Sequence, residues 1–424
     1  MSPTTKCLAS WLAAAALLGG AIAGCGGKGE DSGGSSGGGG SGSIKTGPGI
    51  TDKDITLGLL TDLSGVFAPL AKPIVQGTQQ YWKEQNANGG VCDRTIKLVV
   101  KDHGYDPQKA VVQYRELSDV AGLQQLLGSP ITAALLPSLK KDSMLSMLAA
   151  WPSSLLGNDF IIEIGTTYDV EMINGLGYLQ KQGKLKEGDK IGHIYFEGEY
   201  GENGLKGSKA FAEENGMQVV EQKIKATDED MSGQVSALKR AGVKAIAMTT
   251  APTQLASVAG IGATQGLSVP IVGNNPTYDP ALLESPAAEA VKANAYIVQS
   301  LSTYNSDQPG PVRAAQAWKK AHPDETPKSA VQFGWAQGEV MNEIINQACK
   351  NKDLSREGLV KASRQISDVD LDGITAGPLD YTKVGEPSTR AVYILRPADV
   401  TGGLKAEGDV VETEEAKSYD VAAE

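Results

Sequence analysis

Histidine is scarce in this sequence, and its scarcity argues against the commonest metal sites. The three histidines, His103, His193 and His322, are isolated, and none has metal-ligand spacing to another histidine or to a cysteine. Outside the Gly/Ser-rich tract near the N-terminus there is no Gly-x-Ser-x-Gly turn of a serine hydrolase, and a nucleotide-binding P-loop is missing throughout. We therefore expect no metal, no cofactor and no catalytic residue. The many carboxylates leave an extracellular hydrolase as a minor alternative.

The sequence also lacks an excess of positive charge. Its 39 Lys and Arg residues stand against 50 Asp and Glu residues, which gives a formal net charge of −11. This balance argues against nucleic acid and against an anionic membrane face as a partner. With 424 residues, 41% of them hydrophobic, the chain is long enough for two α/β domains with proper cores.

The first 24 residues are expected to be a lipoprotein signal peptide. Lys6 supplies a positive charge, and the apolar stretch from Leu8 to Ile22 is too short to span a bilayer comfortably. It runs into Ile22-Ala23-Gly24-Cys25, which resembles the lipobox of bacterial lipoproteins, in which the cysteine is lipidated. A plain secretory signal is the alternative. Residues 25–51 would then be the lipidated Cys25 and a Gly/Ser-rich tether, holding the protein at the outer face of the cell membrane.

Four cysteines are present, and two of them remain after the N-terminal segment is set aside. Cys7 lies in the signal and Cys25 is the lipidation candidate, which leaves Cys92 and Cys349. Exported domains often pair their cysteines. The sequence therefore predicts a Cys92–Cys349 disulfide, with two free buried thiols as the alternative.

A β-loop-α-β-loop-α unit is predicted from Asp54 to Ala110. Its parts are a buried strand at 55–60, a Ser64-Gly65 turn, a helix at 73–86, a second strand at 95–101 and a helix after Asp106-Pro107. In doubly wound sheets small ligands bind at the carboxyl ends of the strands. The turn that leaves the first strand is therefore a candidate binding edge.

This unit resembles the start of type I periplasmic solute-binding proteins, and more narrowly the branched-chain amino-acid-binding family of ABC uptake systems. The resemblance lies in "ITLGLLTDLSG", "QGTQQYWKEQNANGG" and "IKLVVKDHGYDPQKAV". It continues in "IYFEGEYGENGLKGSKAFAEENGMQVV", in "VSALKRAGVKAIAMTTAPTQLASVAGIGATQGLSVPIVGNN" and in "GPLDY". These segments cover about residues 52–400, and their order and spacing carry the likeness.

The resemblance implies an α/β fold of two lobes, each a mainly parallel sheet flanked by helices, joined by a three-segment hinge. Lobe 1 would comprise residues 52–166 and 299–375. Lobe 2 would comprise residues 167–298 and 376–402, and residues 403–424 are expected to be an acidic C-terminal tail.

The resemblance also implies where a ligand binds, at loops that face each other between the lobes. Thr132 and Ala133 would hold a polar head group, although Thr132 could be only a helix N-cap. Trp151 could be a wall of the site or a core residue, and Tyr200 would close over the ligand unless it is a surface tyrosine. The full set of expected ligand-binding residues is Ser64, Phe67, Thr132, Ala133, Trp151, Ser153, Tyr200, Thr250 and Asn275.

Asn275 departs from the family's pattern. Amino-acid binders of the family usually carry an acidic residue here, which pairs with the ligand's ammonium group. Asparagine accepts a hydrogen bond but brings no charge, so a desolvated ammonium would be poorly compensated. Asp62, Glu199 or Asp279 could substitute. The departure weakens a branched-chain amino acid as the ligand and leaves room for amides, carboxylates and aromatic acids.

The predicted function is that of a solute-binding lipoprotein that captures a small polar organic ligand, an amino acid or a related amide or carboxylate. It would deliver the ligand to the membrane permease of an ABC importer and act as a monomer. A ligand sensor of the same fold, not coupled to transport, is the alternative.

Overall fold

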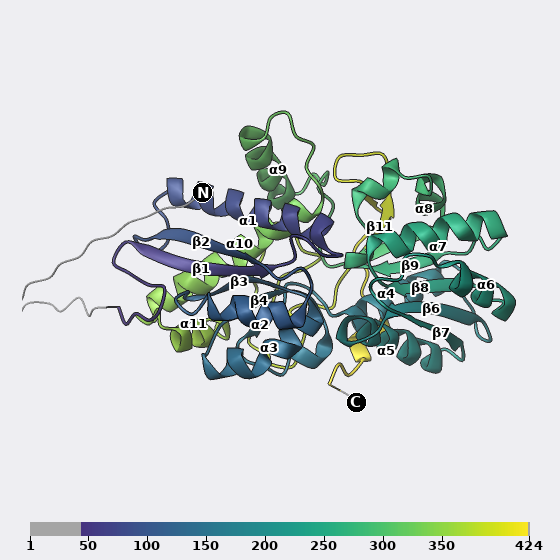
Figure 1. Cartoon of the computed structure of the whole chain (residues 1–424), viewed down its shortest axis with the longest axis horizontal. Helices are drawn as coiled ribbons and strands as arrows, with labels where there is room; N and C mark the ends of the chain where they lie inside the picture. The colour runs from purple at the N-terminus through teal and green to yellow at the C-terminus, as the bar shows by residue number, and fades with distance from the viewer. Residues whose placement is uncertain (1–43, 423–424) are drawn as a thin grey trace, which may run out of the picture. The chain divides into compact units, whose positions relative to one another are not determined.

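Two mainly parallel β-sheets form the framework of the computed structural model, which describes residues 44–422 (Figure 1). The first sheet has the strand order β2-β1-β3-β4-β5 and is parallel throughout. Its strands are β1 (Asp54–Thr61), β2 (Thr95–Asp102), β3 (Gly122–Leu127), β4 (Ser146–Ala149) and β5 (Ile161–Ile162). The predicted α/β fold with two lobes is confirmed.

The second sheet has the order β12-β11-β10-β9-β8-β6-β7. It is parallel except for β11 and β12, which join antiparallel at one edge. Its strands are β6 (Lys190–Phe196), β7 (Gln218–Ile224), β8 (Ala245–Thr249), β9 (Ile271–Asn274), β10 (Ala295–Gln299), β11 (Tyr393–Pro397) and β12 (Leu404–Ala406).

Helices cover both faces of the first sheet and build lobe 1. They are α1 (Ala68–Ala87), α2 (Pro107–Arg115), α3 (Ser129–Lys141), α9 (Pro309–Ala321), α10 (Ala330–Lys350) and α11 (Arg356–Ser363). Trp82 of α1 and Ile344 of α10 share one core cluster with Leu57 of β1. Tyr114 of α2 shares a second cluster with Leu60 of β1. A strand that is buried on both faces reads as a continuous apolar run, which is why β1 is recognisable in the sequence.

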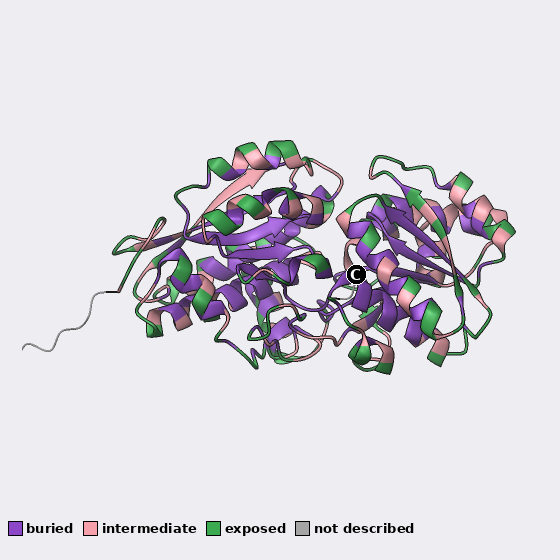
Figure 2. Cartoon of the chain, turned by 90° about the horizontal axis from the view of Figure 1, so that it is seen from below, coloured by how far each residue is buried: buried purple, intermediate pink, exposed green. Residues whose placement is uncertain are grey.

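The second sheet is covered in the same way and builds lobe 2. Its helices are α4 (Tyr168–Lys181), α5 (Glu199–Glu214), α6 (Ser232–Ala241), α7 (Pro252–Gln265), α8 (Ala288–Asn294) and α12 (Glu414–Ser418). Three short 3₁₀ turns complete the described elements: η1 (Ser153–Leu155) in lobe 1, and η2 (Asn275–Thr277) and η3 (Pro280–Glu284) in lobe 2. Figure 2 shows the inner strands of both sheets buried and the outer faces of the helices exposed, while the edge strands β2 and β7 are only partly buried.

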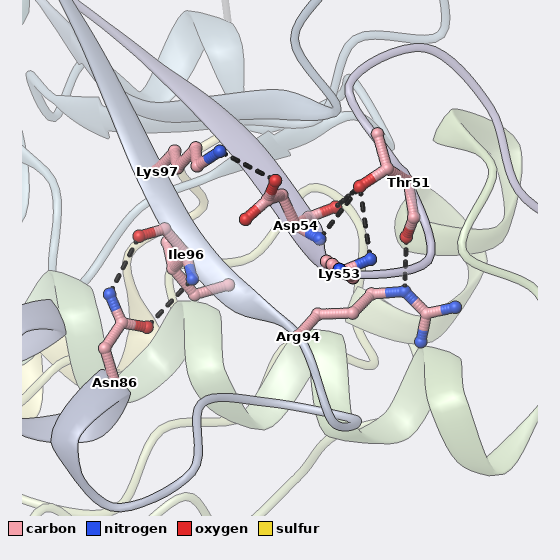
Figure 3. A network of polar contacts seen from close by, with 7 residues as sticks. All are labelled: Thr51, Lys53, Asp54, Asn86, Arg94, Ile96 and Lys97. Carbon is pink, nitrogen blue, oxygen red and sulfur yellow. Dashed lines mark hydrogen bonds and ion pairs between the residues drawn. The ribbon is translucent and has the colours of Figure 1, made fainter.

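The predicted β-α-β unit is tied together at the start of its strands (Figure 3). The side chain of Asn86, at the end of α1, pairs with the backbone of Ile96 on the edge strand β2. Its Nδ2 donates to the Ile96 carbonyl at 2.9 Å, and its Oδ1 accepts from the Ile96 N–H at 2.8 Å. Lys97 and Asp54 form an ion pair of 2.7 Å across β2 and β1. An asparagine side chain thus satisfies part of an open sheet edge.

The chain passes between the lobes three times, after β5, after β10 and after α11. Two buried serines tie these crossings together. Ser388 Oγ donates to the Glu163 carbonyl at 2.8 Å and accepts from the Gly165 N–H at 2.9 Å. Ser300 Oγ accepts from the Thr166 N–H at 2.9 Å. Three crossing segments linked in this way form a hinge between the lobes.

Residues 44–51, which the sequence places in the tether, pack on lobe 1, and Cys25 lies outside the described residues. The N–H of Lys45 donates to the Lys352 carbonyl at 3.0 Å, and the Leu354 N–H donates back to Lys45 at 2.7 Å. Ile44 and Ile50 pack against the lobe 1 core. These two apolar residues hold residues 44–51 on lobe 1.

The expected acidic tail after residue 402 is instead part of lobe 2 over its described length. Leu404 begins β12, and Ala416 of α12 is buried against α4. Arg390 Nη1 donates to the carbonyls of Ala416 and Tyr419 at 2.7 and 2.8 Å. The acidic residues of this segment led to the prediction of a tail, although its apolar residues anchor it to lobe 2.

Cys92 and Cys349, the pair expected from the sequence, are joined by a disulfide. It links the turn after α1 to the end of α10, two helices that pack against each other in lobe 1. Among the described residues, no helix is both long and apolar enough to cross a membrane.

Candidate functional site

A cavity of about 800 Å³, including its open mouth, lies between the two lobes. Lobe 1 contributes the loop after β1, the start of α3 and the start of α10. Lobe 2 contributes the starts of α4 and α5, the turn after β9 and the first residue of β12. The cavity therefore sits where the carboxyl ends of the parallel strands of both sheets meet.

Seven aromatic residues line the cavity. They are Phe67, Tyr105, Trp151, Tyr168, Tyr200, Tyr278 and Phe333, joined by Leu70, Ile74, Leu127, Leu301 and Leu404. The ring of Phe67 lies 4.8 Å from that of Tyr105 and 6.0 Å from that of Tyr200, both edge to face. Tyr168 and Tyr200 are 4.6 Å apart, also edge to face. Of these three contacts, the one between Phe67 and Tyr200 joins the two lobes, and such contacts favour a closed apolar site.

No charged side chain lines this cavity in the part of the chain that the structure describes. Its polar lining consists of Ser129, Asn275, Gln299, Ser302 and Ser329 together with the tyrosine hydroxyls. Burial raises the pKa of Tyr105, Tyr168 and Tyr200, so these phenols stay neutral and can donate hydrogen bonds. The site thus offers neutral donors in an apolar surrounding.

Ser129 provides one polar point of the site. Gly128 adopts φ 102°, which L side chains rarely tolerate, and the chain turns there directly from β3 into α3. Ser129 is the first residue of α3 and is 1% exposed, and its Oγ has no hydrogen-bond partner within residues 44–422. An unpaired hydroxyl at a helix N-terminus, where the first backbone N–H groups are also unpaired, suits a carbonyl or a carboxylate.

Asn275 provides a second polar point, on lobe 2. Its side chain lines the cavity, and its backbone N–H lies 3.4 Å from Glu171 Oε2. The same oxygen accepts a hydrogen bond of 2.8 Å from Asn274 Nδ2. Burial raises the pKa of Glu171 to about 8, and the nearby Asp169 adds to the rise. At neutral pH this carboxyl is therefore protonated and uncharged.

Four of the nine expected ligand-binding residues are brought together in the cavity wall: Phe67, Trp151, Tyr200 and Asn275. Tyr200 is 4% exposed, and its hydroxyl donates to the Thr250 carbonyl at 2.9 Å, which excludes the surface-loop alternative. Trp151 Nε1 donates to the Ile164 carbonyl at 2.8 Å, which holds the indole in place. That these four residues bind ligand stays a prediction.

The other five expected residues do not line the cavity. Thr132 Oγ1 donates back to the Gly128 carbonyl at 3.0 Å, and Ala133 is half-buried on α3. With Thr132 as the N-cap, this helix would begin after residue 132, whereas it begins at Ser129. Ser129 therefore lines the cavity at this helix start, and Thr132 and Ala133 do not. The remaining three are Ser64, Ser153 and Thr250, whose hydroxyls donate within the protein to Asp102 (2.7 Å), Asp169 (2.7 Å) and the Ala251 carbonyl (3.3 Å).

Ser64 helps to shape the loop after β1. Burial alone would raise the pKa of Asp102, but hydrogen bonds from Leu63, Ser64, Gly104 and Lys109 outweigh it and lower that pKa. Asp102 therefore holds this loop as a charged acceptor.

The three acids that could have replaced an acid at position 275 are engaged elsewhere. Asp62 accepts the Phe67 N–H at 2.9 Å, and Glu199 accepts a hydrogen bond of 2.7 Å from Ser154. Asp279 pairs with Lys328 at 3.2 Å. Since none of the three lines the cavity, the site lacks a carboxylate partner for an ammonium group.

Sequence reasoning missed Tyr105, Ser129, Tyr168, Tyr278 and Phe333. One signal was available for Ser129, because Gly-Ser-Pro after an apolar strand places proline in the first turn of a helix. Tyr105 has φ 61°, unusual for a tyrosine, and that conformation is not visible in the sequence. Phe333 comes from α10, which is remote in the chain, so only the folded lobe places it beside Trp151, with ring centroids 5.0 Å apart.

Comparison with known proteins is consistent with this geometry. A family model described as "Periplasmic binding protein" matches residues 54–402. A solved structure titled "Fatty acid ABC transporter substrate-binding protein from Thermomonospora curvata" is 44% identical, with a TM-score of 0.86; the match covers 89% of this chain and 97% of that one. No curated protein sequence matches.

More distant structures share the fold. A branched chain amino acid ABC transporter structure from Thermus thermophilus with bound valine is 18% identical, with a TM-score of 0.77; the match covers 87% of this chain and 99% of that one. A leucine binding protein from Thermotoga maritima MSB8 is 16% identical, with a TM-score of 0.72; here 85% and 99% are covered.

Proposed function

This chain belongs to the periplasmic binding protein family, a solute-binding family and not an enzyme family, and we propose that its ligand is a carboxylic acid with a large apolar part. It would bind this acid outside the cytoplasmic membrane and pass it to the permease of an ABC importer. A long-chain or medium-chain fatty acid fits this description. The sequence predicted a small polar organic ligand, such as an amino acid or a related amide or carboxylate. The proposal selects the carboxylates among these, adds a large apolar part, and no longer favours amino acids.

The observation that carries the proposal is the cavity lining, which is aromatic and contains no charged side chain among the described residues. An amino acid brings an ammonium group that would be desolvated here without a carboxylate partner. A carboxylate needs hydrogen-bond donors, and Ser129 Oγ, the start of α3 and the phenols of Tyr105 and Tyr168 provide neutral ones. The apolar remainder of the ligand would contact Phe67, Trp151 and the other rings.

The 44% identical structure supports the same ligand class, because that protein is described as a fatty acid ABC transporter substrate-binding protein. The structure with bound valine and the leucine binding protein are each less than 25% identical to this chain, so they support the fold alone. Together with the neutral lining, this makes an apolar acid the better proposal.

Binding measurements on protein that has been unfolded and refolded, to remove co-purified ligand, test the proposal. We expect calorimetry to detect decanoate and octanoate binding, and to detect little or no binding of leucine, valine or decylamine. Tight leucine binding without decanoate binding would overturn the proposal. Native mass spectrometry of the protein as purified would identify any ligand that it already carries.

Ser129→Ala tests the head-group position, with Thr132→Ala as the matched control on the same helix. Loss of a hydrogen bond to a charged group costs about 1.5–3 kcal/mol, or roughly 10- to 100-fold in affinity. We expect such a loss for decanoate in Ser129→Ala. Thr132→Ala should stay within about twofold, because its hydroxyl bonds inside the helix.

We also propose that Cys25 is lipidated and anchors the protein to the outer face of the cell membrane; it lies outside the described residues. The Ile22-Ala23-Gly24-Cys25 run supports this proposal. In a detergent phase-separation experiment on the full chain expressed in a lipoprotein-processing bacterium, the wild type should enter the detergent phase. Cys25→Ser should stay in the aqueous phase. Equal partition of the two proteins would contradict the anchor.

A further inference from the structure

We propose that Glu171 makes binding of an acidic ligand pH-dependent, because the carboxyl behind Asn275 must hold a proton for an anionic head group to be accepted. This inference rests on the proposed function, since it requires an anionic ligand. It assigns a positioning and specificity role to a residue that does not itself line the cavity.

Glu171 is connected to two residues of lobe 2 that line the cavity, Tyr168 and Asn275. Glu171 lies in the first turn of α4, the helix whose first residue, Tyr168, lines the cavity. Its Oε2 accepts from the backbone N–H of Asn275, which also lines the cavity, and from Asn274 Nδ2. The residue is 2% exposed. A change of charge at Glu171 therefore acts next to the ligand and on the loop that contacts it.

A chain of buried hydrogen bonds continues behind Glu171, and its directions can be assigned. Asn274 Nδ2 donates to the Tyr168 carbonyl at 3.1 Å, so Asn274 Oδ1 is an acceptor. Thr249 Oγ1 must then donate to that oxygen, at 2.8 Å. His193 Nε2, 2.9 Å from Thr249 Oγ1, is left to donate its own proton. Burial lowers the pKa of His193 to about 3, so this ring is neutral and brings no positive charge.

The groups that face Glu171 from the neighbouring elements do not compensate a negative charge. Asp169 comes from α4 itself and raises the pKa of Glu171. Tyr168 of α4 and Tyr200 of α5 are neutral phenols, and β6 adds the neutral His193. Asn274, the last residue of β9, and Asn275, which follows it, contribute neutral amide groups. The lysines on α5 and α12 interact elsewhere: Lys206 donates to the Val421 carbonyl at 3.4 Å, Lys209 pairs with Glu221, and Lys417 pairs with Glu414.

The expected effect follows from linkage between the proton and the ligand. The carboxyl of a fatty acid, with a pKa of about 4–5 like that of Glu, is ionised throughout the neutral range. Since the pKa of Glu171 is about 8, its side chain is neutral below that pH and becomes a buried anion above it. Two anions close together in a low-dielectric site repel, so affinity for the ligand should fall as the pH rises through 8. In turn, a bound anion raises the pKa of Glu171.

The test compares the wild type with Glu171→Gln, which keeps an acceptor for Asn274 and Asn275 but cannot ionise. Affinities for decanoate and for the neutral decanamide are measured at pH 6, 7, 8 and 9. We expect wild-type affinity for decanoate to fall at least threefold from pH 7 to pH 9, while decanamide affinity stays constant. In Glu171→Gln both affinities should stay constant. Glu187→Gln, at an exposed glutamate, is the control and should behave like the wild type.

Proton uptake gives a second readout that needs no variant, so the inference remains testable if Glu171→Gln fails to fold. Calorimetry at pH 8 in buffers of different ionisation enthalpy should show proton uptake with decanoate and none with decanamide. If decanoate binds with the same affinity at every pH, or if Glu171→Gln keeps the wild-type fall, the inference is wrong while the proposed function stands. If decanoate does not bind at pH 6 or 7, the proposed function itself is wrong.

Discussion

The ammonium group of Lys328 lies 3.2 Å from both carboxylate oxygens of Asp279, and this ion pair joins the two lobes at the edge of the cavity. Lys328 precedes α10 of lobe 1, and its neighbour Ser329 lines the cavity. Asp279 follows η2 of lobe 2, and its neighbour Tyr278 lines the cavity. The Asp279 side chain is only 3% exposed. The pair therefore belongs to the closed arrangement of the lobes.

Removal of the lysine charge should favour the open arrangement. In Lys328→Met, the Asp279 carboxylate loses its charged partner on closure and keeps only its bond from the Ala281 N–H. Lys328 is more than a third exposed, so solvent screens part of the interaction. We expect the Kd for decanoate to rise about threefold to tenfold, mostly through faster dissociation in stopped-flow measurements. Lys319→Met, on the exposed face of α9, should leave both rates unchanged; equal rates in both variants would contradict the role of the pair.

A single added methyl group should also oppose closure. Gly402, in the hairpin between β11 and β12 of lobe 2, has φ +83°, and a Cβ there would lie 2.7 Å from Tyr304 Cβ of lobe 1. Gly408 has φ +82°, and a Cβ there would meet nothing within 4 Å. Gly402→Ala and Gly408→Ala thus carry similar backbone strain, but only the first carries the collision. We expect Gly402→Ala to weaken decanoate binding at least fivefold more than Gly408→Ala.

Asn275→Asp should change the preferred ligand from an anion to a cation. The new carboxylate would face the cavity, repel an acid and provide a partner for an ammonium group. We expect at least a tenfold loss of decanoate affinity and measurable binding of decylamine, both read by calorimetry. Asn275→Ala is the control, because it removes the amide without adding charge. If Asn275→Asp bound decanoate as the wild type does, Asn275 would not face the ligand.

Loss of the Cys92–Cys349 disulfide should destabilise lobe 1. The bond joins positions 257 residues apart, and such cross-links typically contribute about 2–5 kcal/mol, largely by restricting the unfolded chain. The double variant Cys92→Ala/Cys349→Ala should therefore unfold at lower denaturant concentration than the oxidised wild type. Addition of a reductant should destabilise the wild type and leave the double variant unchanged. Peptide mapping of a non-reduced digest should contain the cross-linked pair.

Several parts of the fold were predictable because their signals are local. The apolar run of β1 marks a strand buried on both faces, and Asn88-Gly89-Gly90 marks the end of α1. The family resemblance then supplied the order of the lobes. The end of the chain was misread because its acidic residues alternate with apolar ones, and some of these, such as Ala416, pack on α4. Composition reports the average of a segment, whereas packing depends on a few of its residues.

The site was predictable only where one loop supplies one side chain. Phe67, Tyr200 and Asn275 were found because each follows a strand end, and strand ends meet at one edge of a parallel sheet. Ser129 was missed because the helix starts earlier than expected, and an earlier start places a different side chain at the cavity. Phe333 and the pair Lys328–Asp279 come from segments that are far apart in the chain.

The sequence by itself determined the two-lobe α/β fold, the class of solute-binding protein and the absence of an acid at position 275. These properties reside in short patterns of apolar residues, turn residues and single side chains. Only the tertiary structure decided that the cavity is lined by aromatic residues and, among residues 44–422, by no charged side chain, that Ser129 lines it, and that Glu171 is buried next to Asn275 with no described cation paired to it. The physical reason is that burial and the resulting pKa depend on every neighbour that the fold assembles, and most of these neighbours are distant in the chain.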